Sequence, residues 1–145
     1  MDVRRVLVPV DFSDCSRRAL ESAKSLAEKY GASLHLLTVV PDPFALPNPG
    51  PWYVPVTPEY VDGLRRDAEW HLRELMSQAE QARFHAEPAV AFGDASAEIL
   101  NYAKRAPADL IVMGTHGRGG LTHALVGSVA EKVIRAAPCP VLTVH

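Results

Sequence analysis

The stretch that decides the fold runs Asp109-Leu110-Ile111-Val112-Met113-Gly114-Thr115-His116-Gly117, and the dipeptide Gly127-Ser128 follows it. An apolar run that ends in glycines, ahead of a segment with helical periodicity, predicts a strand, a glycine loop and a helix N-terminus in succession. Glycines let backbone N–H groups approach an anion closely, and a helix N-terminus presents unpaired donors with a partial positive charge. The stretch therefore predicts a phosphate site without a lysine, and we expect a nucleotide as its ligand.

The composition indicates one domain over residues 1–145, since 48% of the residues are hydrophobic and can form a sizeable core. The formal charge of −2 shows no basic excess of the kind that indicates nucleic-acid binding. No apolar run approaches the ~20 residues of a membrane span, and no targeting segment is recognisable, so we expect a cytoplasmic protein without a membrane partner. Cys15 and Cys139 are too few for a disulfide framework and are expected to be reduced and structural.

Strand-like and helix-like segments alternate along the chain. We expect strands over Val3–Val10, Ser33–Val40, Ala86–Phe92, Asp109–Met113 and Pro140–Val144. We expect helices from Ser13 or Asp14 to Tyr30, from Pro58 through Ala79 as one long helix, from Ala95 to Arg105, and from Ser128 through Ala137. Residues 41–58 hold seven of the twelve prolines, which predicts a long surface loop.

Five strands separated by helices predict a doubly wound α/β fold, with one five-stranded parallel sheet and helices on both faces. Ligands of such sheets bind beyond the C-terminal strand ends, where the strand order reverses. If the first and fourth strands are central neighbours, Asp11 and the segment Gly114–Gly117 converge at that point. Asp11 then has two interpretations: its carboxylate accepts hydrogen bonds from ribose hydroxyls, or it caps the first helix together with Ser13.

Other well-known motifs do not fit the glycine loop. A Walker A loop requires a lysine directly after its second glycine, but Gly119 is followed by Gly120. A dinucleotide-binding Gly-x-Gly-x-x-Gly motif that began at Gly117 would require glycine in place of Thr122. The nucleophile elbow Gly-x-Ser-x-Gly is also absent, and a triad of Ser128, His116 and Asp11 is not favoured.

Several segments together resemble the universal stress protein family, and the similarity covers essentially the whole chain. The matching segments are residues 8–13, 109–120, 127–128 and 137–144. The most specific element is Gly-x2-Gly-x9-Gly-[Ser/Thr], which is satisfied by Gly114, Gly117, Gly127 and Ser128. In that family the motif marks the branch that binds ATP. The resemblance implies a Rossmann-like, adenine nucleotide alpha hydrolase-like fold, with ATP, or AMP or ADP, as the ligand.

The resemblance also implies a role for each matching residue. The four motif residues match the positions that hold the ribose and the phosphates through backbone N–H groups and the serine hydroxyl. The strand end Pro9-Val10-Asp11 matches the position beside adenine and ribose. Val39, or Val40 if the strand register differs by one residue, matches the position whose backbone contacts the adenine edge. The remaining residues expected at the site are Met113, His116, Arg118 and Val129.

Arg118 has two interpretations, because a loop arginine either contacts the phosphates by a charge-assisted hydrogen bond or remains solvated. A divalent ion, Mg²⁺ or Mn²⁺, can accompany the phosphates in the family. No all-protein metal cage is evident, which fits a metal held mainly by phosphate and water. No water-positioning group or second catalytic carboxylate is evident near the loop, so we do not expect strong ATPase activity.

Three functions are therefore compatible with the sequence. The favoured one is an ATP-dependent stress-response or signalling protein, whose protein partner the sequence does not identify. The alternatives are a slow ATP hydrolase or phosphoryl transferase, and a nucleotide-free interaction dimer.

The last expected strand, Pro140–Val144, predicts a homodimer. An edge strand without charged residues exposes unpaired backbone groups, and a two-fold axis beside it would pair two sheets antiparallel. The family resemblance points the same way, since its members commonly dimerise through this strand. The alternative is a monomer in which the chain's own helix covers the edge.

Overall fold

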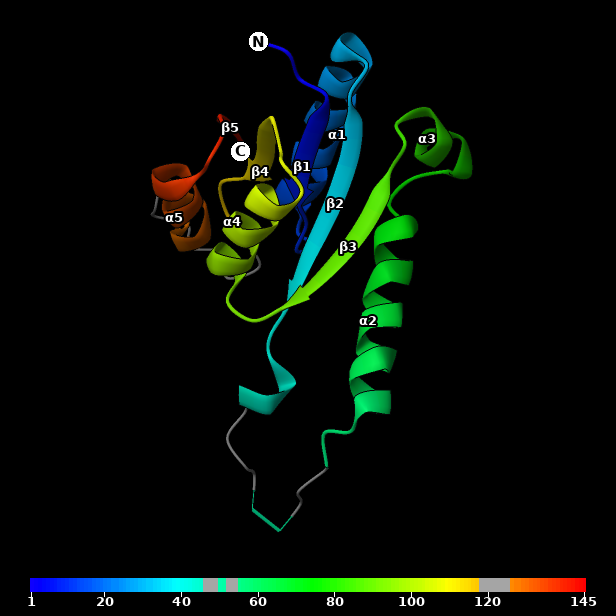
Figure 1. Ribbon diagram of the computed structural model, residues 1–145, viewed down its shortest axis with the longest axis vertical. Coiled ribbons are helices and arrows are strands. Elements are labelled where there is room, and N and C mark those ends of the chain that lie inside the picture. The colour runs from blue at the N-terminus through cyan, green and yellow to red at the C-terminus, as the bar shows by residue number, and fades with distance from the viewer. Residues whose placement is uncertain (46–49, 52–54, 118–125) are drawn as a thin grey trace.

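Five parallel strands form one sheet in the order β3-β2-β1-β4-β5 in the computed structural model, which describes residues 1–45, 50–51, 55–117 and 126–145 (Figure 1). The strands are β1 (Arg5–Pro9), β2 (Ser33–Val40), β3 (Glu87–Phe92), β4 (Leu110–Gly114) and β5 (Val141–Val144). The helices are α1 (Asp14–Tyr30), the 3-10 helix η1 (Pro43–Ala45), α2 (Pro58–Arg73), α3 (Gln78–Arg83), α4 (Ala95–Arg105) and α5 (Ser128–Ala136). The predicted fold is confirmed, and β1 and β4 are central neighbours.

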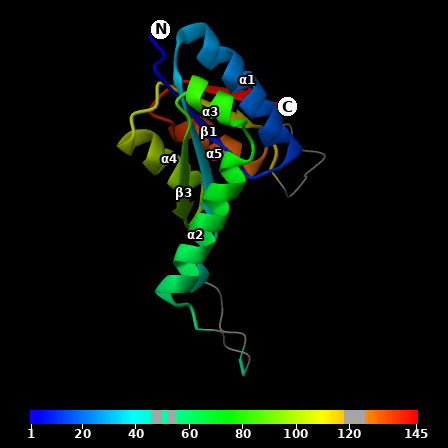
Figure 2. The same cartoon turned by 90° about the vertical axis from the view of Figure 1, so that its right-hand side faces the viewer.

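Helices cover both faces of the sheet, and in Figure 2 the helices α1, α2 and α3 lie in front of it. The strands divide their apolar side chains between the two faces with the period of two that a strand imposes. On β1, Val6 and Val8 join the core cluster beneath α1 and α2, whereas Leu7 joins the cluster beneath α4 and α5. All three side chains are fully buried, which is the pattern of a central strand in a doubly wound sheet.

Most predicted element boundaries lie within one or two residues of the observed ones. The first strand begins at Arg5 and not at Val3, and the third begins at Glu87. The fourth strand is shifted by one residue, because the carboxylate of Asp109 accepts the backbone N–H groups of Arg4 and Arg5, at 2.9 Å each, ahead of the strand. The last helix ends at Ala136, and the last strand begins at Val141.

The predicted single helix from Pro58 through Ala79 is wrong, because the chain forms two helices there. Ser77 and Glu80 make a capping box in which the serine hydroxyl accepts the Glu80 N–H and the Glu80 carboxylate accepts the Ser77 N–H. The Gln81 side chain donates to the carbonyls of Arg73 and Met76, at 3.0 Å each, and so satisfies the end of α2. Apolar periodicity continues across this break, which is why the pattern alone predicted one helix.

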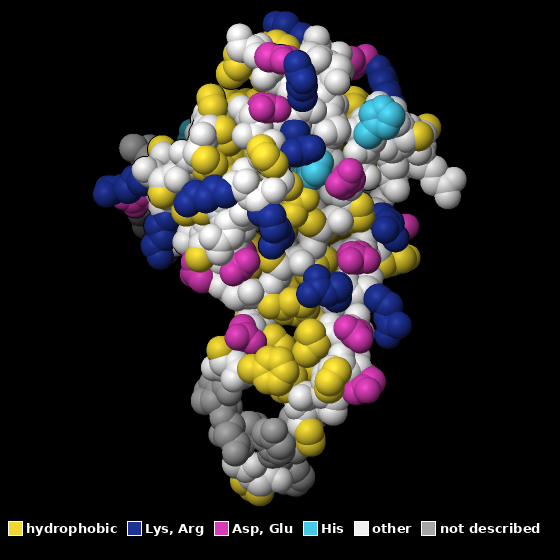
Figure 3. Space-filling view, in the orientation of Figure 1, with side chains coloured by type: hydrophobic (Ala, Val, Ile, Leu, Met, Phe, Trp, Pro, Cys, Tyr) yellow, Lys and Arg dark blue, Asp and Glu magenta, His cyan; other side chains and the backbone are white. Residues whose placement is uncertain are grey.

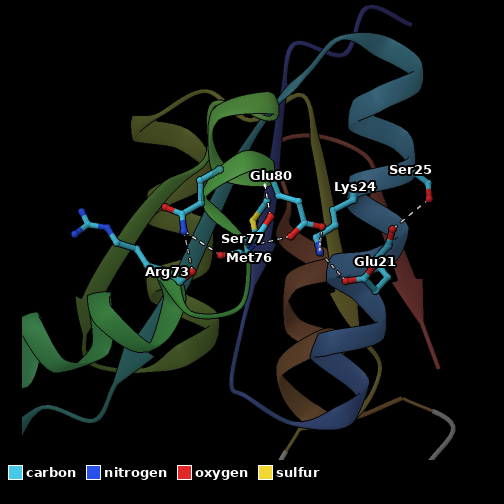
Figure 4. A network of polar contacts seen from close by, with 8 residues as sticks. Glu21, Lys24, Ser25, Arg73, Met76, Ser77 and Glu80 are labelled. Atoms are coloured by element: carbon cyan, nitrogen blue, oxygen red, sulfur yellow. Dashed lines mark hydrogen bonds and ion pairs between the residues drawn. The ribbon is translucent and has the colours of Figure 1, made fainter.

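Lys24 of α1 ties the short helix α3 to the rest of the molecule (Figure 4). Its ammonium group donates to Glu21 at 2.8 Å and to Glu80 at 3.0 Å, and its side chain is only 12% exposed. Burial lowers the pKa of Lys24, but the two carboxylates outweigh this effect and the pKa is raised. Lys24 therefore stays charged and links α1 to the capping box of α3.

The face of the molecule in Figure 3 mixes basic, acidic and hydrophobic side chains over the main body. Two aromatic side chains at the end of the molecule that carries η1 and the start of α2 are exposed: Phe44 and Tyr60. Within the described part of the chain, no helix combines the length and the apolar character needed to cross a membrane.

A buried histidine on β2 contacts a tyrosine of α4, on the face of the sheet that α4 and α5 cover. The Nδ1 atom of His35 lies 2.7 Å from the hydroxyl of Tyr102, and its Nε2 atom lies 3.7 Å from the carboxylate of Glu87. Burial lowers the pKa of His35, Glu87 opposes this effect, and the charge of Arg5 adds to it, so the folded state favours the neutral imidazole.

The stability of the fold should consequently decrease as the pH falls below the ordinary histidine pKa of about 6.5. The folded pKa is depressed, so the unfolded chain binds more protons in that window and the free energy of unfolding falls. Urea denaturation at about pH 7.5 and about pH 5 measures the decrease. We expect a smaller decrease in His35→Gln than in wild type, whereas a variant of the exposed His85, His85→Asn, should retain the wild-type decrease. If the free energy of unfolding decreased equally between the two pH values in all three proteins, His35 would not be the cause of the decrease.

Candidate functional site

A cavity of about 300 Å³ opens at the C-terminal ends of the central strands, where the strand order reverses. β1 leads into it through Pro9, Val10 and Asp11, and β2 contributes Leu37 and Val39. β4 and the loop after it contribute the residues from Met113 to Gly117. The start of α5, from Gly127 to Ala130, closes one side. With one residue from α1 and two from α4, segments from six parts of the chain thus meet at the position that the predicted topology indicated.

Eleven of the twelve residues expected at the site line this cavity. They are Pro9, Val10, Asp11, Val39, Met113, Gly114, His116, Gly117, Gly127, Ser128 and Val129. Arg118 lies outside the described residues. Val39, and not Val40, faces the cavity.

Six lining residues were not expected from the sequence: Ser16, Leu37, Ala95, Ile99, Thr115 and Ala130. The period of a strand contained a signal for Leu37, because it lies two residues before Val39 and so shares its face. Ala95 and Ile99 lie one helical turn apart on α4, but the sequence gives no sign that this turn meets the end of β4. That contact arises from the tertiary fold.

The cavity has an apolar wall and a polar rim. Leu37, Ile99 and Met113 belong to the core cluster beneath α4 and α5, so the wall continues that core to the surface. The polar residues of the lining are Asp11, Ser16, Thr115, His116 and Ser128. A flat apolar ring suits the wall, while hydroxyl and anionic groups suit the rim.

Three helices begin at this cavity, and they differ in how their first N–H groups are satisfied. Ser13 caps α1 by accepting the Ser16 N–H, and Asp94 caps α4 by accepting the Ala97 N–H. Gly127 is the N-cap of α5 and provides no side-chain cap. The first N–H groups of α5 are therefore the ones best suited to receive an anion, together with the positive end of the helix dipole.

The three glycines around the cavity each lie close to another part of the chain, and at Gly114 and Gly127 the neighbour includes backbone atoms that cannot easily shift. A Cβ atom on Gly114 would lie 2.9 Å from Sγ and 3.1 Å from the carbonyl carbon of Cys15. A Cβ atom on Gly117 would lie 2.8 Å from Oδ2 of Asp11, and one on Gly127 would lie 2.8 Å from the carbonyl oxygen of Thr115. The glycines of the motif therefore bring the loop against α1 and β1, in addition to exposing backbone N–H groups.

The two interpretations of Asp11 both find support in the geometry. Ser13, and not Asp11, is the N-cap of α1. Oδ1 of Asp11 accepts the Ser13 N–H at 3.0 Å and also the Ser13 hydroxyl, so Asp11 orients the cap. Oδ2 lies on the side of Gly117, and the residue lines the cavity. One carboxylate thus supports the helix start and faces the candidate site.

Thr115 connects the glycine loop to the last strand. Its N–H donates to the Val144 carbonyl at 2.9 Å, and its carbonyl accepts the Gly127 N–H at 2.6 Å. Its hydroxyl lies 2.9 Å from Nδ1 of His116 and 3.2 Å from Nδ1 of His145. Since this side chain is almost fully buried, these contacts fix the backbone around which the cavity is built.

Cys15 lies beneath the cavity in the first turn of α1. Burial raises the pKa of its thiol, but hydrogen bonds from the His116 backbone and from Thr115, with the charge of Arg18, outweigh burial and lower it. Burial raises the pKa of Cys139, and the charge of Asp109 adds to this effect. Both thiols are free. Among the residues placed in the structure, no group of three or more His, Cys, Asp or Glu side chains is arranged to hold a metal ion.

Residues 2–145 match the model of the Universal stress protein family. The chain is 36% identical to the universal stress protein MJ0531 of Methanocaldococcus jannaschii, over 97% of this chain and 81% of that protein. It is 33% identical to the universal stress protein YxiE of Bacillus subtilis, over 97% and 98%. The universal stress protein UspA from Lactobacillus plantarum superposes with a TM-score of 0.75 at 30% identity, over 100% of this chain and 99% of that one. The chain therefore belongs to the universal stress protein family.

Proposed function

We propose that this protein binds an adenine nucleotide, with ATP as the favoured ligand, and acts as a nucleotide-dependent stress-response or signalling module. The observation that carries the proposal is the meeting, in one cavity, of an apolar wall, a carboxylate and a helix N-terminus whose N-cap residue is a glycine. Two other universal stress proteins were solved in complex with cAMP and, from Archaeoglobus fulgidus, with dAMP; at 24% and 20% identity they share the fold.

In the proposed complex, each part of the nucleotide has a matching part of the cavity. The base packs on the wall formed by Leu37, Ile99 and Met113, with the backbone of Val39 at its polar edge. A ribose hydroxyl donates to Asp11. The phosphates accept from backbone N–H groups near Gly127 and from the Ser128 hydroxyl, where the α5 dipole favours negative charge. Mg²⁺ or Mn²⁺, if bound, is held by phosphate oxygens and water, since Asp11 is the sole carboxylate in the described lining.

Gly117→Val tests the nucleotide site, because a side chain at this position, which lines the cavity, projects toward the Asp11 carboxylate. We expect the affinity for ATP to fall at least about tenfold, which corresponds to about 1.4 kcal/mol. Isothermal titration calorimetry measures the affinity, and thermal unfolding checks that the fold is retained. Gly127 is a poorer choice, because its Cβ atom would displace the Thr115 carbonyl and disturb the backbone itself.

The matched control is Gly63→Val, because a Cβ atom at this glycine of α2 meets nothing within 4 Å. This variant should bind ATP as wild type does. Undiminished ATP affinity in Gly117→Val would refute the site assignment. Absence of nucleotide binding by the wild-type protein would favour the nucleotide-free interaction dimer instead.

We also propose that two copies pair through β5, because the two edges of the sheet differ. Hydrogen bonds from the N–H groups of Ile111 and Thr115 to Pro140 and Val144 show that alternate residues of β5 face β4. The backbone groups of Val141 and Thr143 therefore point to the open edge. Neither residue is a proline, so both edge N–H groups are available to a second strand.

The opposite edge, at β3, is blunted. Gly93 donates to Val40 of β2, so Pro88, Val90 and Phe92 direct their backbone toward the open side. Pro88 has no N–H group, and the guanidinium of Arg65 donates to the Val90 carbonyl at 2.9 Å. Arg65 also lies over the Phe92 ring, 5.0 Å from its centroid. A second strand would find few free partners at β3, which leaves β5 as the edge suited to pairing.

Leu142→Lys tests this dimer, because Leu142 is 41% exposed on β5 and the fold does not require it to be buried. A lysine on each copy would place like charges across the two-fold axis, so we expect monomers. Sedimentation velocity at micromolar concentration distinguishes the two states. Tyr60→Lys, which places the same charge on an equally accessible site of α2, should leave the dimer intact. A wild-type protein that sediments as a monomer would contradict the proposal.

A further inference from the structure

The residue after Asp11 has an unusual backbone conformation. Phe12 has a φ of 65°, and in the part of the chain that the structure describes only His85 shares a positive φ among non-glycine residues. The left-handed region is unfavourable for a side chain with a Cβ atom, and such strain persists only where surrounding contacts enforce it. The conformation therefore needs a structural cause, and its position beside the cavity suggests a functional one.

The left-handed turn determines where the Asp11 carboxylate lies. It redirects the chain between the end of β1 and the first turn of α1, so that Oδ1 of Asp11 meets the N–H and the hydroxyl of Ser13. The same placement leaves Oδ2 against Gly117, at the rim of the cavity. A relaxed turn with negative φ at Phe12 would redirect Ser13 and release the carboxylate from this position.

The ring of Phe12 is anchored on the other side of the sheet from the cavity wall. It packs against the core cluster beneath α1 and α2, whereas the wall belongs to the cluster beneath α4 and α5. Its centroid lies 6.0 Å from that of the His71 ring of α2, in an edge-to-face arrangement. His71 in turn lies 5.0 Å from the Trp70 ring. The Phe12 ring therefore joins the turn after β1 to α2.

We propose that Phe12 is a positioning residue for the nucleotide site: its ring, packed on His71, maintains the left-handed turn that holds the Asp11 carboxylate at the rim, where it selects a ribose over a deoxyribose. The inference rests on the proposed function. It adds a specificity determinant that does not itself touch the ligand. A carboxylate that accepts a ribose hydroxyl is worth roughly a tenfold preference, and this preference is lost if the carboxylate moves.

The test compares the affinities of ATP, 2′-deoxy-ATP and 3′-deoxy-ATP by calorimetry. Wild type should favour ATP roughly tenfold over at least one deoxy analogue, and Asp11→Asn should lose most of this preference. Phe12→Ala keeps the Cβ atom that makes a positive φ unfavourable, but it removes the ring. This variant should lose the preference for ATP, while its affinity for the deoxy analogue stays near that of wild type. His71→Ala, which removes the anchor but leaves Phe12, should lose part of it, and Tyr60→Ala on the same helix should lose none.

Retention of the wild-type preference in folded Phe12→Ala would overturn the inference, and so would an equal loss of affinity for ATP and for both analogues. If Phe12→Ala fails to fold, His71→Ala provides the test instead. The His71 side chain is half exposed, so its removal should leave the fold intact.

A second measurement needs no ligand. Amide hydrogen exchange of Ser13, whose N–H donates to Asp11, should be faster in Phe12→Ala and His71→Ala than in wild type and Tyr60→Ala. Failure of wild type to bind any adenine nucleotide would refute the proposed function, whereas unchanged Ser13 exchange would refute the role of Phe12.

Discussion

The site depends on the close packing of the first turn of α1 against the end of β4. This packing requires Gly114, because a Cβ atom there would lie within 3.1 Å of two atoms of Cys15, one of them in the backbone. The contact sets the strand-to-helix turn after β1 beside the loop after β4. Asp11 and Gly117, which are distant in sequence, become neighbours at the reversal of strand order. A larger residue at this point would separate the two halves of the cavity.

Thr115 extends the same constraint to the edge of the sheet. One residue binds the N-cap of α5 through its carbonyl, the end of β5 through its N–H, and His116 and His145 through its hydroxyl. Arg18 of α1 adds a hydrogen bond to the His145 carbonyl at 2.7 Å. The rim of the cavity and the last residues of the edge strand are therefore built on shared backbone contacts, and neither can move far alone.

Sequence reasoning predicted the features that depend on local chemistry. The start of the first helix at Ser13 or Asp14, its end at Tyr30 and the start of the second helix at Pro58 each depend on residues close in sequence, and all are observed. The glycine motif and the family resemblance together indicated most of the cavity lining, but not Ala95 and Ile99, which reach the site through tertiary packing of α4. The capping box at Ser77 is a local signal, yet it competed with an apolar period that continues into α3, and the cap prevails in the structure.

The two core clusters explain why the turn after β1 carries the strain. The cavity wall continues the core beneath α4 and α5, so the residues that face it are fixed by that core. Asp11 lies at the boundary between the two faces, where β1 ends, and the N–H and hydroxyl of Ser13 hold its carboxylate. Phe12 packs against the core cluster beneath α1 and α2 and adds a constraint on this turn, at the cost of a left-handed backbone. A glycine here would adopt the same φ without strain, but it would leave the turn without an anchor on α2.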